Sequence, residues 1–148
     1  MTLRSWSMAS LLVAAAAVTA GQDPAPQVAG VSLGSTPQSV RSVLGSPDRQ
    51  QESLGLRFWD YEQRGITLIW REGESGVHGI VASRAEAGDV EGVRVGDRER
   101  ELRGKLGAPA RVRQGGRFLD FIGASWVLSI EVRRGRVVEI TLLGTGGP

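Results

Sequence analysis

The chain has 148 residues, with 18 basic and 16 acidic side chains, a formal net charge of +2 and no cysteine. The lack of cysteine excludes disulfide bonds and thiolate metal sites, and a single histidine excludes histidine-rich metal sites. No basic stripe with interleaved aromatic residues is present, so we expect no nucleic-acid partner.

The first twenty residues have the layout of a secretory signal peptide. Arg4 precedes an apolar stretch from Met8 to Val18, and small residues follow up to Ala20. This stretch is short beside the roughly 20 residues that a membrane-spanning helix needs. We therefore expect cleavage after Ala20 and a secreted or periplasmic protein with no stable membrane anchor. A retained anchor is the less favoured alternative.

Two stretches of the remaining chain share one outline. GVSLGSTPQSVRSVLGSP at 30–47 and GVRVGDRERELRGKLGAP at 92–109 are offset by 62 positions. Identical or similar residues fall at eight of the aligned positions in these two stretches. We interpret this as an internal duplication, with one repeat over 21–89 and a second over 90–148.

Each of these stretches predicts a short helix. Thr36 is a suitable N-cap with Pro37 at the first helical position, and Asp97 is the expected cap of the second helix. Gly45 and Gly107 are suited to end the two helices, and a proline follows two positions after each glycine. The apolar positions expected to face the core are Val40, Val43, Leu44, Leu102 and Leu106.

Strand-like segments follow each predicted helix. They cover 54–61, 66–71 and 77–82 in the first half, and 110–113, 117–121, 125–132 and 137–143 in the second. Short turns between strands require antiparallel neighbours. The sequence thus predicts an α+β fold of two tandem repeats. Each repeat is a short helix plus a three- to four-stranded antiparallel meander, and the repeats share or abut one sheet with helices on one face.

These motifs resemble a known family. The pattern Gly-Val-x-Leu-Gly-x-Thr at 30–36, the short helix, Leu-Gly-x-Pro at 44–47 and the pair Trp59 and Tyr61 resemble the SmpA/OmlA (BamE-like) outer-membrane assembly lipoproteins. The doubled form resembles the β-lactamase inhibitory proteins (BLIP-like superfamily). The resemblance implies a module that binds another protein.

The sequence offers little for catalysis. His78 lies in a Gly-Val-His-Gly segment and is interpreted as a surface residue at a strand edge rather than as a base. Asp60 and Asp120 occupy corresponding places in the two halves, so a paired carboxylate site is conceivable if the halves bring them together. A structural role for each carboxylate is the favoured interpretation. We expect no cofactor and no metal site.

Aromatic residues are the candidate binding groups, because tryptophan and tyrosine are frequent anchors in protein interfaces. Phe58 and Asp60 alternate with Trp59 and Tyr61, so one of these two pairs must face the helices. For each aromatic residue taken singly, burial in the core is the favoured role and recognition of a partner is the alternative. The candidate binding residues are Trp59, Asp60, Tyr61, Trp70, Asp120, Phe121 and Trp126.

Charge is divided unevenly along the chain. Residues 28–90 hold 6 arginines against 8 acids, while residues 91–148 hold 10 arginines and Lys105 against 7 acids. This gives net charges of −2 and +4, and such a dipole can orient a charged partner. Lys105 is the only lysine, which indicates GC-rich codons and a bacterial source.

We therefore predict a secreted or periplasmic, non-enzymatic protein-binding module. One form of it is an inhibitor of an envelope or extracellular hydrolase. The alternative is an accessory protein of the cell envelope or of outer-membrane assembly. An enzyme that uses Asp60 and Asp120 is the least favoured interpretation.

Overall fold

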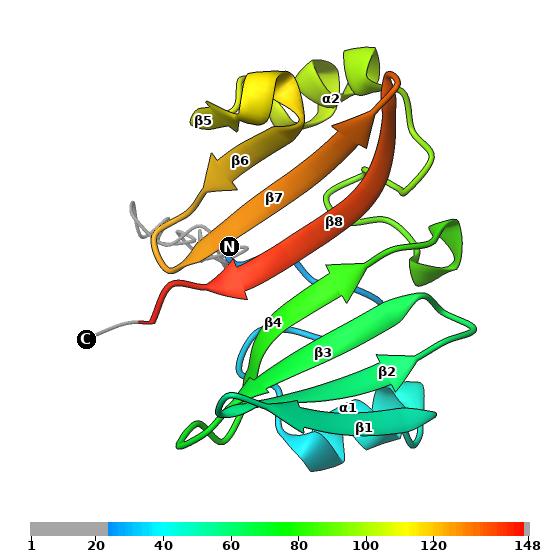
Figure 1. Ribbon diagram of the computed structural model, residues 1–148, viewed down its shortest axis with the longest axis vertical. Helices are drawn as coiled ribbons and strands as arrows, with labels where there is room; N and C mark the ends of the chain where they lie inside the picture. Colours follow the sequence, from blue (N-terminus) through cyan, green and yellow to red (C-terminus); the bar gives the residue numbers. More distant parts are fainter. Residues whose placement is uncertain (1–23, 147–148) are drawn as a thin grey trace, which may run out of the picture.

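The protein is mostly β, and its strands form one eight-stranded antiparallel sheet (Figure 1). The structure is a computed structural model that describes residues 24–146. The strands lie across the sheet in the order β1-β2-β3-β4-β8-β7-β6-β5. Their bounds are β1 Arg49–Ser53, β2 Leu56–Tyr61, β3 Ile66–Arg71, β4 Val77–Ala82, β5 Arg111–Arg113, β6 Phe118–Ile122, β7 Trp126–Arg133 and β8 Arg136–Gly144.

Two short α-helices accompany the sheet within residues 24–146. They are α1 Pro37–Leu44 and α2 Glu99–Leu106, each of 8 residues. Single 3-10 turns at Ala85–Ala87 and Gln114–Gly116 complete the regular structure of this part of the chain.

The predicted fold class is wrong. An α+β protein of two tandem helix-plus-meander repeats was expected, but the chain forms a single eight-stranded sheet with only two short helices in the described residues. The physical reason lies in the pairing of β4 with β8, from Gly79 opposite Leu143 to Ala82 opposite Ile140. Hydrogen bonds thus run without a break from β1 to β5. The predicted division at 89/90 is not tested by this arrangement and stays a prediction.

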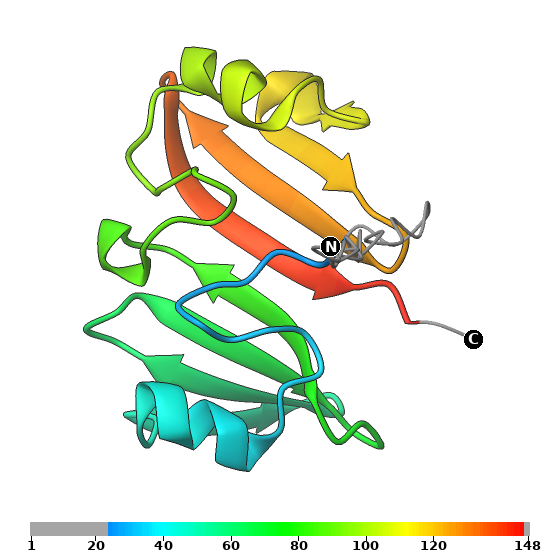
Figure 2. The same cartoon turned by 180° about the vertical axis from the view of Figure 1, so that it is seen from behind.

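One face of the sheet is covered and the other is open. Figure 2, seen from behind, shows α1, α2 and the segment before α1 on the near side of the sheet, whereas in Figure 1 no helix lies in front of β2, β3, β4, β8 or β7. The covering elements contribute buried residues such as Val28, Val40, Val90 and Leu102. The strands contribute the largest buried side chains, which include Ile66, Leu68, Ile80, Leu128, Ile130, Ile140 and Leu142. The core is this single layer between the sheet and its cover.

The helix signals are confirmed in part. Thr36 caps α1 and accepts a hydrogen bond from the Ser39 backbone N–H at 3.2 Å. The predicted cap Asp97 is wrong, because Arg98 occupies the N-cap of α2 and makes no side-chain cap bond. The Asp97 carboxylate instead accepts hydrogen bonds from the Arg94 backbone N–H and from Lys105 Nζ, both at 3.0 Å.

The segments before the helices are held to the sheet by backbone hydrogen bonds. Gly34 N–H donates to the Val77 carbonyl and Gly96 N–H donates to the Val137 carbonyl, both at 2.8 Å. The apolar stripe of α1 is narrower than predicted, since Val40 is buried while Val43 is 50% exposed. Thus each short helix inserts one fully buried side chain, and backbone bonds at its start fix its position.

No helix within residues 24–146 has the length and apolar character to cross a membrane. The predicted signal peptide at 1–20 lies outside the described residues.

Candidate protein-binding face

The open face of the sheet presents two parallel rows of side chains that cross the strands. Because side chains alternate between the faces of a sheet, the residues opposite the buried set all point to the open side. The first row, here called the polar row, is Arg49, Asp60, Thr67, Val81, Thr141, Ser129, Asp120 and Arg111. The second row, here called the apolar row, is Phe58, Ile69, Gly79, Leu143, Val127 and Ile122.

Asp120 anchors one end of the polar row. Its carboxylate is fully buried, and it accepts hydrogen bonds from Arg111 Nε at 2.8 Å, from Arg113 Nε at 2.7 Å and from Ser129 Oγ at 2.8 Å. The hydrogen bond from Arg113, outweighing desolvation, lowers the pKa of Asp120 to about 2. Asp120 is therefore a permanent anion at neutral pH, and its oxygens are committed to partners within the protein.

Asp60 anchors the other end in a weaker version of the same arrangement. Thr67 Oγ1 donates to its carboxylate at 2.8 Å, and Arg49 Nε donates at 3.3 Å. The side chain of Asp60 is 17% exposed, and that of Arg49 is 58% exposed. Each carboxylate thus ties an edge strand to the rest of the sheet.

The paired carboxylate site is ruled out by this geometry. Asp60 on β2 and Asp120 on β6 are five strand positions apart, which at about 4.8 Å per strand places them about 24 Å from one another. Two carboxylates that share acid–base work lie within about 10 Å of each other. These two residues serve as separate ends of one row and cannot act on one bond.

The apolar row has exposed side chains, whereas the carboxylates of the polar row are bonded to neighbouring side chains. Ile122 and Leu143 expose 53% and 36% of their surface. Gly79 leaves room for its neighbours, since a Cβ there would lie 2.6 Å from Leu143 Cδ2 and 3.3 Å from Ile69 Cδ1. The row is thus continuous across six strands, with side chains packed over a glycine at its centre.

A cluster of charged residues borders the rows near β5 and β6. Arg113 and Arg117 both lie over the Phe118 ring, at 4.8 Å and 5.3 Å from its centroid. Arg117 and Arg133 donate to Glu131 Oε1 at 2.8 Å and 2.7 Å. The bond from Arg117 is the main cause that lowers the pKa of Glu131. These contacts fix long side chains that would otherwise be flexible.

The aromatic residues predicted for binding lie on the other face. Trp59, Tyr61, Trp70 and Phe121 are buried under the helices, with exposures of 2%, 4%, 4% and 9%. Trp126 is partly buried and packs against the same core. These predicted binding residues are therefore core residues in the structure, and only Asp60 and Asp120 of the predicted set reach the open face.

Alternation in the sequence left open which of the two faces is inside, and the structure shows that the face with Trp59 and Tyr61 is covered. Trp59 and Trp70 contact one another with ring centroids 4.8 Å apart, and Arg41 of α1 lies 4.9 Å above Trp59. The Tyr61 hydroxyl donates to the Gly45 carbonyl at the end of α1 at 3.0 Å. The aromatic set thus holds α1 against the sheet. The sequence pattern did not reveal the apolar row, and Phe58 is the one member of that row among the residues discussed from the sequence.

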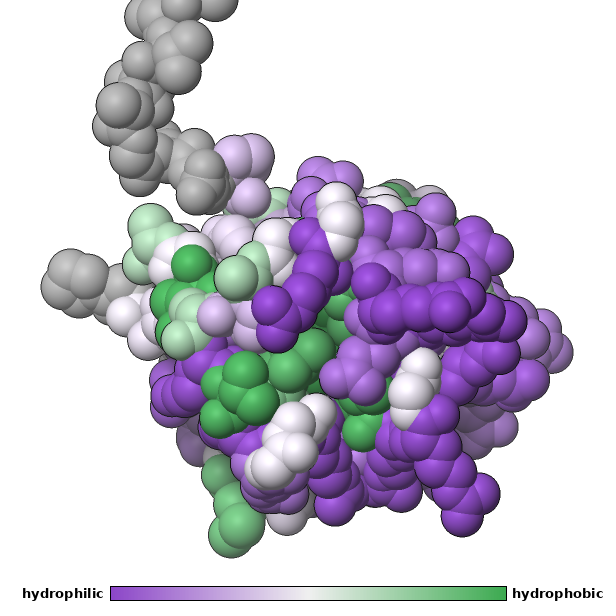
Figure 3. Space-filling view, turned by 90° about the horizontal axis from the view of Figure 1, so that it is seen from above, coloured by the Kyte–Doolittle hydropathy of each residue, from purple (hydrophilic) through white to green (hydrophobic). Residues whose placement is uncertain are grey.

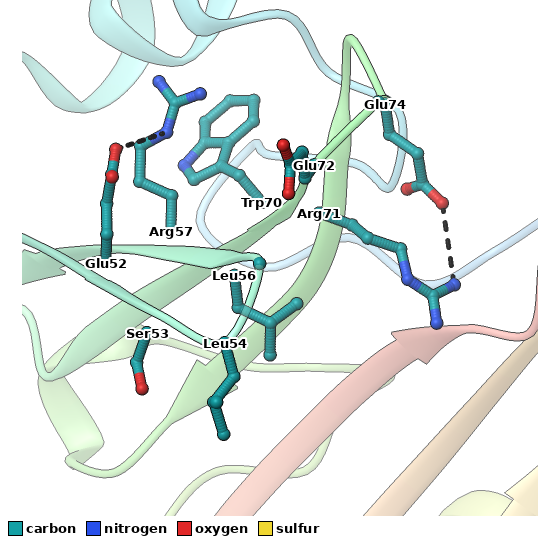
Figure 4. Close-up of a pocket in the computed structure, with 11 residues that line it drawn as sticks. Glu52, Ser53, Leu54, Leu56, Arg57, Trp70, Arg71, Glu72 and Glu74 are labelled. Carbon is teal, nitrogen blue, oxygen red and sulfur yellow. Dashed lines mark ion pairs between the residues drawn. The ribbon is translucent and has the colours of Figure 1, made fainter.

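A hollow lies at the β1–β2 and β3–β4 turns (Figure 4). It has a volume of 460 Å³, and ion pairs at 3.7 Å from Arg57 to Glu52 and at 3.8 Å from Arg71 to Glu74 border it. Trp70 points toward Arg57, and its buried Nε1 has no hydrogen-bond partner in the described structure. The lining contains no histidine and no thiol.

His78 is not a surface residue at a strand edge. It lies at an irregularity in the interior strand β4, its side chain is 16% exposed, and its Nδ1 is 3.2 Å from Glu74 Oε2. Within residues 24–146 there is no group of three or more histidine, cysteine or acidic residues that could hold a metal ion.

Comparison with known proteins gives similarity of fold alone. No protein family and no curated protein matches the sequence. A cysteine-rich secretory protein from Staphylococcus aureus superposes with a TM-score of 0.61 at 12% identity, over 84% of this chain and 49% of that chain. An extracellular SCP-domain protein from Bacillus anthracis gives a TM-score of 0.54 at 11% identity, over 84% and 48%.

A DUF4309 family protein from Bacillus subtilis has a similar fold, with a TM-score of 0.52 at 14% identity over 74% of this chain and 78% of that chain. The chain spans about half the length of the first two proteins. At these identities the likeness extends to the fold and not to activity.

Proposed function

We propose that this protein is an exported, non-enzymatic module that binds another protein through its open sheet face. The observation that carries the proposal is the apolar row, which leaves Ile122 and Leu143 exposed on a sheet face with no covering element in the described chain. Interfaces between proteins combine such an apolar centre with a polar rim. Here the polar row and the arginines around Phe118 form that rim.

Rigidity of the polar row supports this use. A side chain that is already fixed loses little conformational entropy when a partner docks. Asp120, Arg111, Arg113 and Ser129 hold one another by five hydrogen bonds between side chains, of 2.7–3.1 Å. The same bonds commit the Asp120 carboxylate, which supports a non-enzymatic role.

Export is part of the proposal. The signal-peptide layout of residues 1–20 supports it, and two of the similar structures are named as a secretory and an extracellular protein. The motif resemblance to SmpA/OmlA and to the β-lactamase inhibitory proteins favours a protein partner. An envelope or extracellular hydrolase is the first candidate for it. A component of outer-membrane assembly is the second candidate, favoured by the SmpA/OmlA motif.

The test is capture of a partner from envelope and culture fractions of the source organism on immobilised protein. The decisive comparison is between wild type, the double variant Ile122→Asp with Leu143→Asp, and the control Leu54→Asp. Leu54 is fully exposed on the β1–β2 turn, away from the apolar row, and has a φ of 51° that aspartate tolerates better than leucine.

We expect a protein that is retained by wild type and by the control but lost with the double variant. Retention of every captured protein by the double variant contradicts the proposal. Identification of the captured protein as a hydrolase or as an assembly component separates the two candidates.

A further inference from the structure

Arginines gather at one end of the molecule, around the β7–β8 turn and the start of α2. Two adjoining hollows of 450 Å³ and 780 Å³ share Glu99 and Gly135 in their lining. The first hollow is lined by Arg98, Arg100, Arg103 and Arg136, and the second by Arg117, Arg133 and Arg134. These seven arginines are here called the basic end. Figure 3, which looks onto this end from above, shows strongly hydrophilic side chains around a smaller hydrophobic area.

The backbone forces some of these like charges together. Arg136 lies opposite Arg133 in the β7–β8 ladder, and it also pairs with Arg98 through an isolated β-bridge. Like charges that lie directly opposite each other in a sheet destabilise it. Arg133 is compensated by Glu131, whereas the bridged pair Arg98 and Arg136 has no carboxylate partner and carries an electrostatic cost that a bound anion would relieve.

Most of these arginines have no acidic partner of their own. Arg117 and Arg133 bond Glu131, but no ion pair joins Arg98, Arg100, Arg103, Arg134 or Arg136 to a carboxylate in residues 24–146. Elsewhere the same chain pairs its arginines readily, as Arg111 and Arg113 do with Asp120. Within residues 24–146, Arg41 and Arg64 are the two arginines outside the basic end that also make no ion pair, so arginines without an acidic partner are concentrated at this end.

The opposite end of the molecule is weakly acidic, because three glutamates there face Arg57 and Arg71, which pair with two of them. Glu52, Glu72 and Glu74 gather at the β1–β2 and β3–β4 turns, which Figure 1 shows at the far end of the longest axis from α2. Charges separated in this way give a dipole along that axis, which orients an approaching charged partner.

We propose that the basic end binds an acidic polypeptide segment of the partner protein. This inference rests on the proposed function, because it names the chemistry of that partner. Guanidinium groups bind carboxylates through two parallel hydrogen bonds, and hollows lined by them suit protruding aspartate and glutamate side chains. Glu99 lines both hollows and repels negative charge placed between them. This favours a ligand with separate carboxylates, such as an acidic peptide, over the continuous negative surface of an anionic membrane.

The test uses a short dye-labelled poly-L-glutamate peptide and the full chain, with binding followed by fluorescence anisotropy at low salt. Arg134→Gln with Arg136→Gln removes two charges from the basic end. The matched control, Arg57→Gln with Arg71→Gln, removes two charges from the opposite end, where both arginines make only long exposed ion pairs.

The basic-end variant is expected to bind the peptide about tenfold more weakly, and the control to remain within about twofold of wild type. A second basic-end variant, Arg98→Gln with Arg103→Gln, should show the same loss. Thermal melting of each variant separates lost binding from lost folding.

Three results would overturn the inference. They are no binding of poly-L-glutamate by the wild type, equal weakening in the control, and stronger binding to phosphatidylserine vesicles than to the peptide. The proposed function is tested separately, because Ile122→Asp with Leu143→Asp should leave poly-L-glutamate binding unchanged. If the captured partner is lost in this open-face variant but retained by both basic-end variants, the result supports binding through the open face and contradicts binding of the partner by the basic end.

Discussion

Asp120 is the residue on which the open face depends most. It is fully buried on the side of the sheet that has no cover, because Arg111 and Arg113 lie over it. Asp60 takes the corresponding place near the other edge with one arginine, at a longer distance of 3.3 Å. The chain thus contains a strong and a weak version of one arrangement, and the same substitution can be compared at both.

Asp120→Asn is expected to destabilise the protein by about 2–3 kcal/mol, because a buried group loses its charge while two arginines lose their partner. The matched change Asp60→Asn should cost less than about 1 kcal/mol, because its one arginine, Arg49, is 58% exposed and lies at the longer distance of 3.3 Å. Urea unfolding of both variants measures the difference. Equal losses of unfolding free energy in the two variants would show that the burial of Asp120 does not determine how much it stabilises the protein.

The same residue predicts a loss of stability in acid. The folded-state pKa of Asp120 is lowered from 3.8 to about 2, chiefly by the bond from Arg113. The stability contributed by the ionised group is therefore fully present above about pH 5 and is lost as the pH falls through about 4 to 2. The difference in unfolding free energy between wild type and Asp120→Asn should shrink over this window. If this difference in unfolding free energy stays constant from pH 5 to pH 2, the lowered pKa of Asp120 in the folded protein is contradicted.

At the residue scale, the sequence predicted which side chains share a face but not which face is covered. Trp59 and Tyr61 were placed opposite Phe58 and Asp60, and the structure confirms that alternation. Both pairs contain an aromatic residue, so composition could not decide between them. The bonds of Asp120 depend on the register of β5 against β6, which no local pattern contains.

At the scale of elements, the central strand β4 is fitted closely to its neighbour β8. Gly79→Ala would place a methyl group 2.6 Å from Leu143 Cδ2, the far end of a side chain that is 36% exposed on the open face, so Leu143 must turn aside at a cost of about 1 kcal/mol. The control is Gly104→Ala in α2, where no atom lies within 4 Å of the new Cβ and alanine favours the helix by about 1 kcal/mol. Chemical denaturation should therefore show opposite signs for the two substitutions. A stabilised Gly79→Ala variant would mean that β4 and β8 pack more loosely than described.

The elements themselves were predicted unevenly. The start of α1 was predicted from Thr36 and Pro37, because local signals specify a helix N-terminus. The strand β1 was missed entirely, because its five residues are all polar or charged and all exposed. Such composition protects an edge strand from pairing with other chains, and it also removes the alternation by which strands are recognised.

At the scale of the whole molecule, the β4–β8 pairing joins all the strands into one sheet. A chain that ends at residue 89 would keep β1 to β4 but lose the four strands that follow, and it would expose the edge of β4. A four-stranded sheet with one helix of 8 residues buries too little apolar surface to be stable alone. We expect this fragment to show no cooperative thermal transition by circular dichroism. A sharp transition would show that the sheet consists of two independent units.

The whole fold was the part that the sequence described least well. The two similar stretches predicted helices and a repeat, whereas most of the regular structure is in strands. Pairing between β4 and β8 links residues about 60 positions apart, as in Gly79 with Leu143, and no local signal specifies such a contact. The two short helices matter as a cover for one face of the sheet, and the open face follows from their small number.

The central claim is that the open face binds a protein, and the most direct test is the dissociation constant of the captured partner. Isothermal titration calorimetry should show binding at least about 100-fold weaker for Ile122→Asp with Leu143→Asp, because the two substitutions place charges in the apolar row, one next to its centre and one at its end. Leu54→Asp should bind like wild type. Equal dissociation constants for all three proteins would contradict the account.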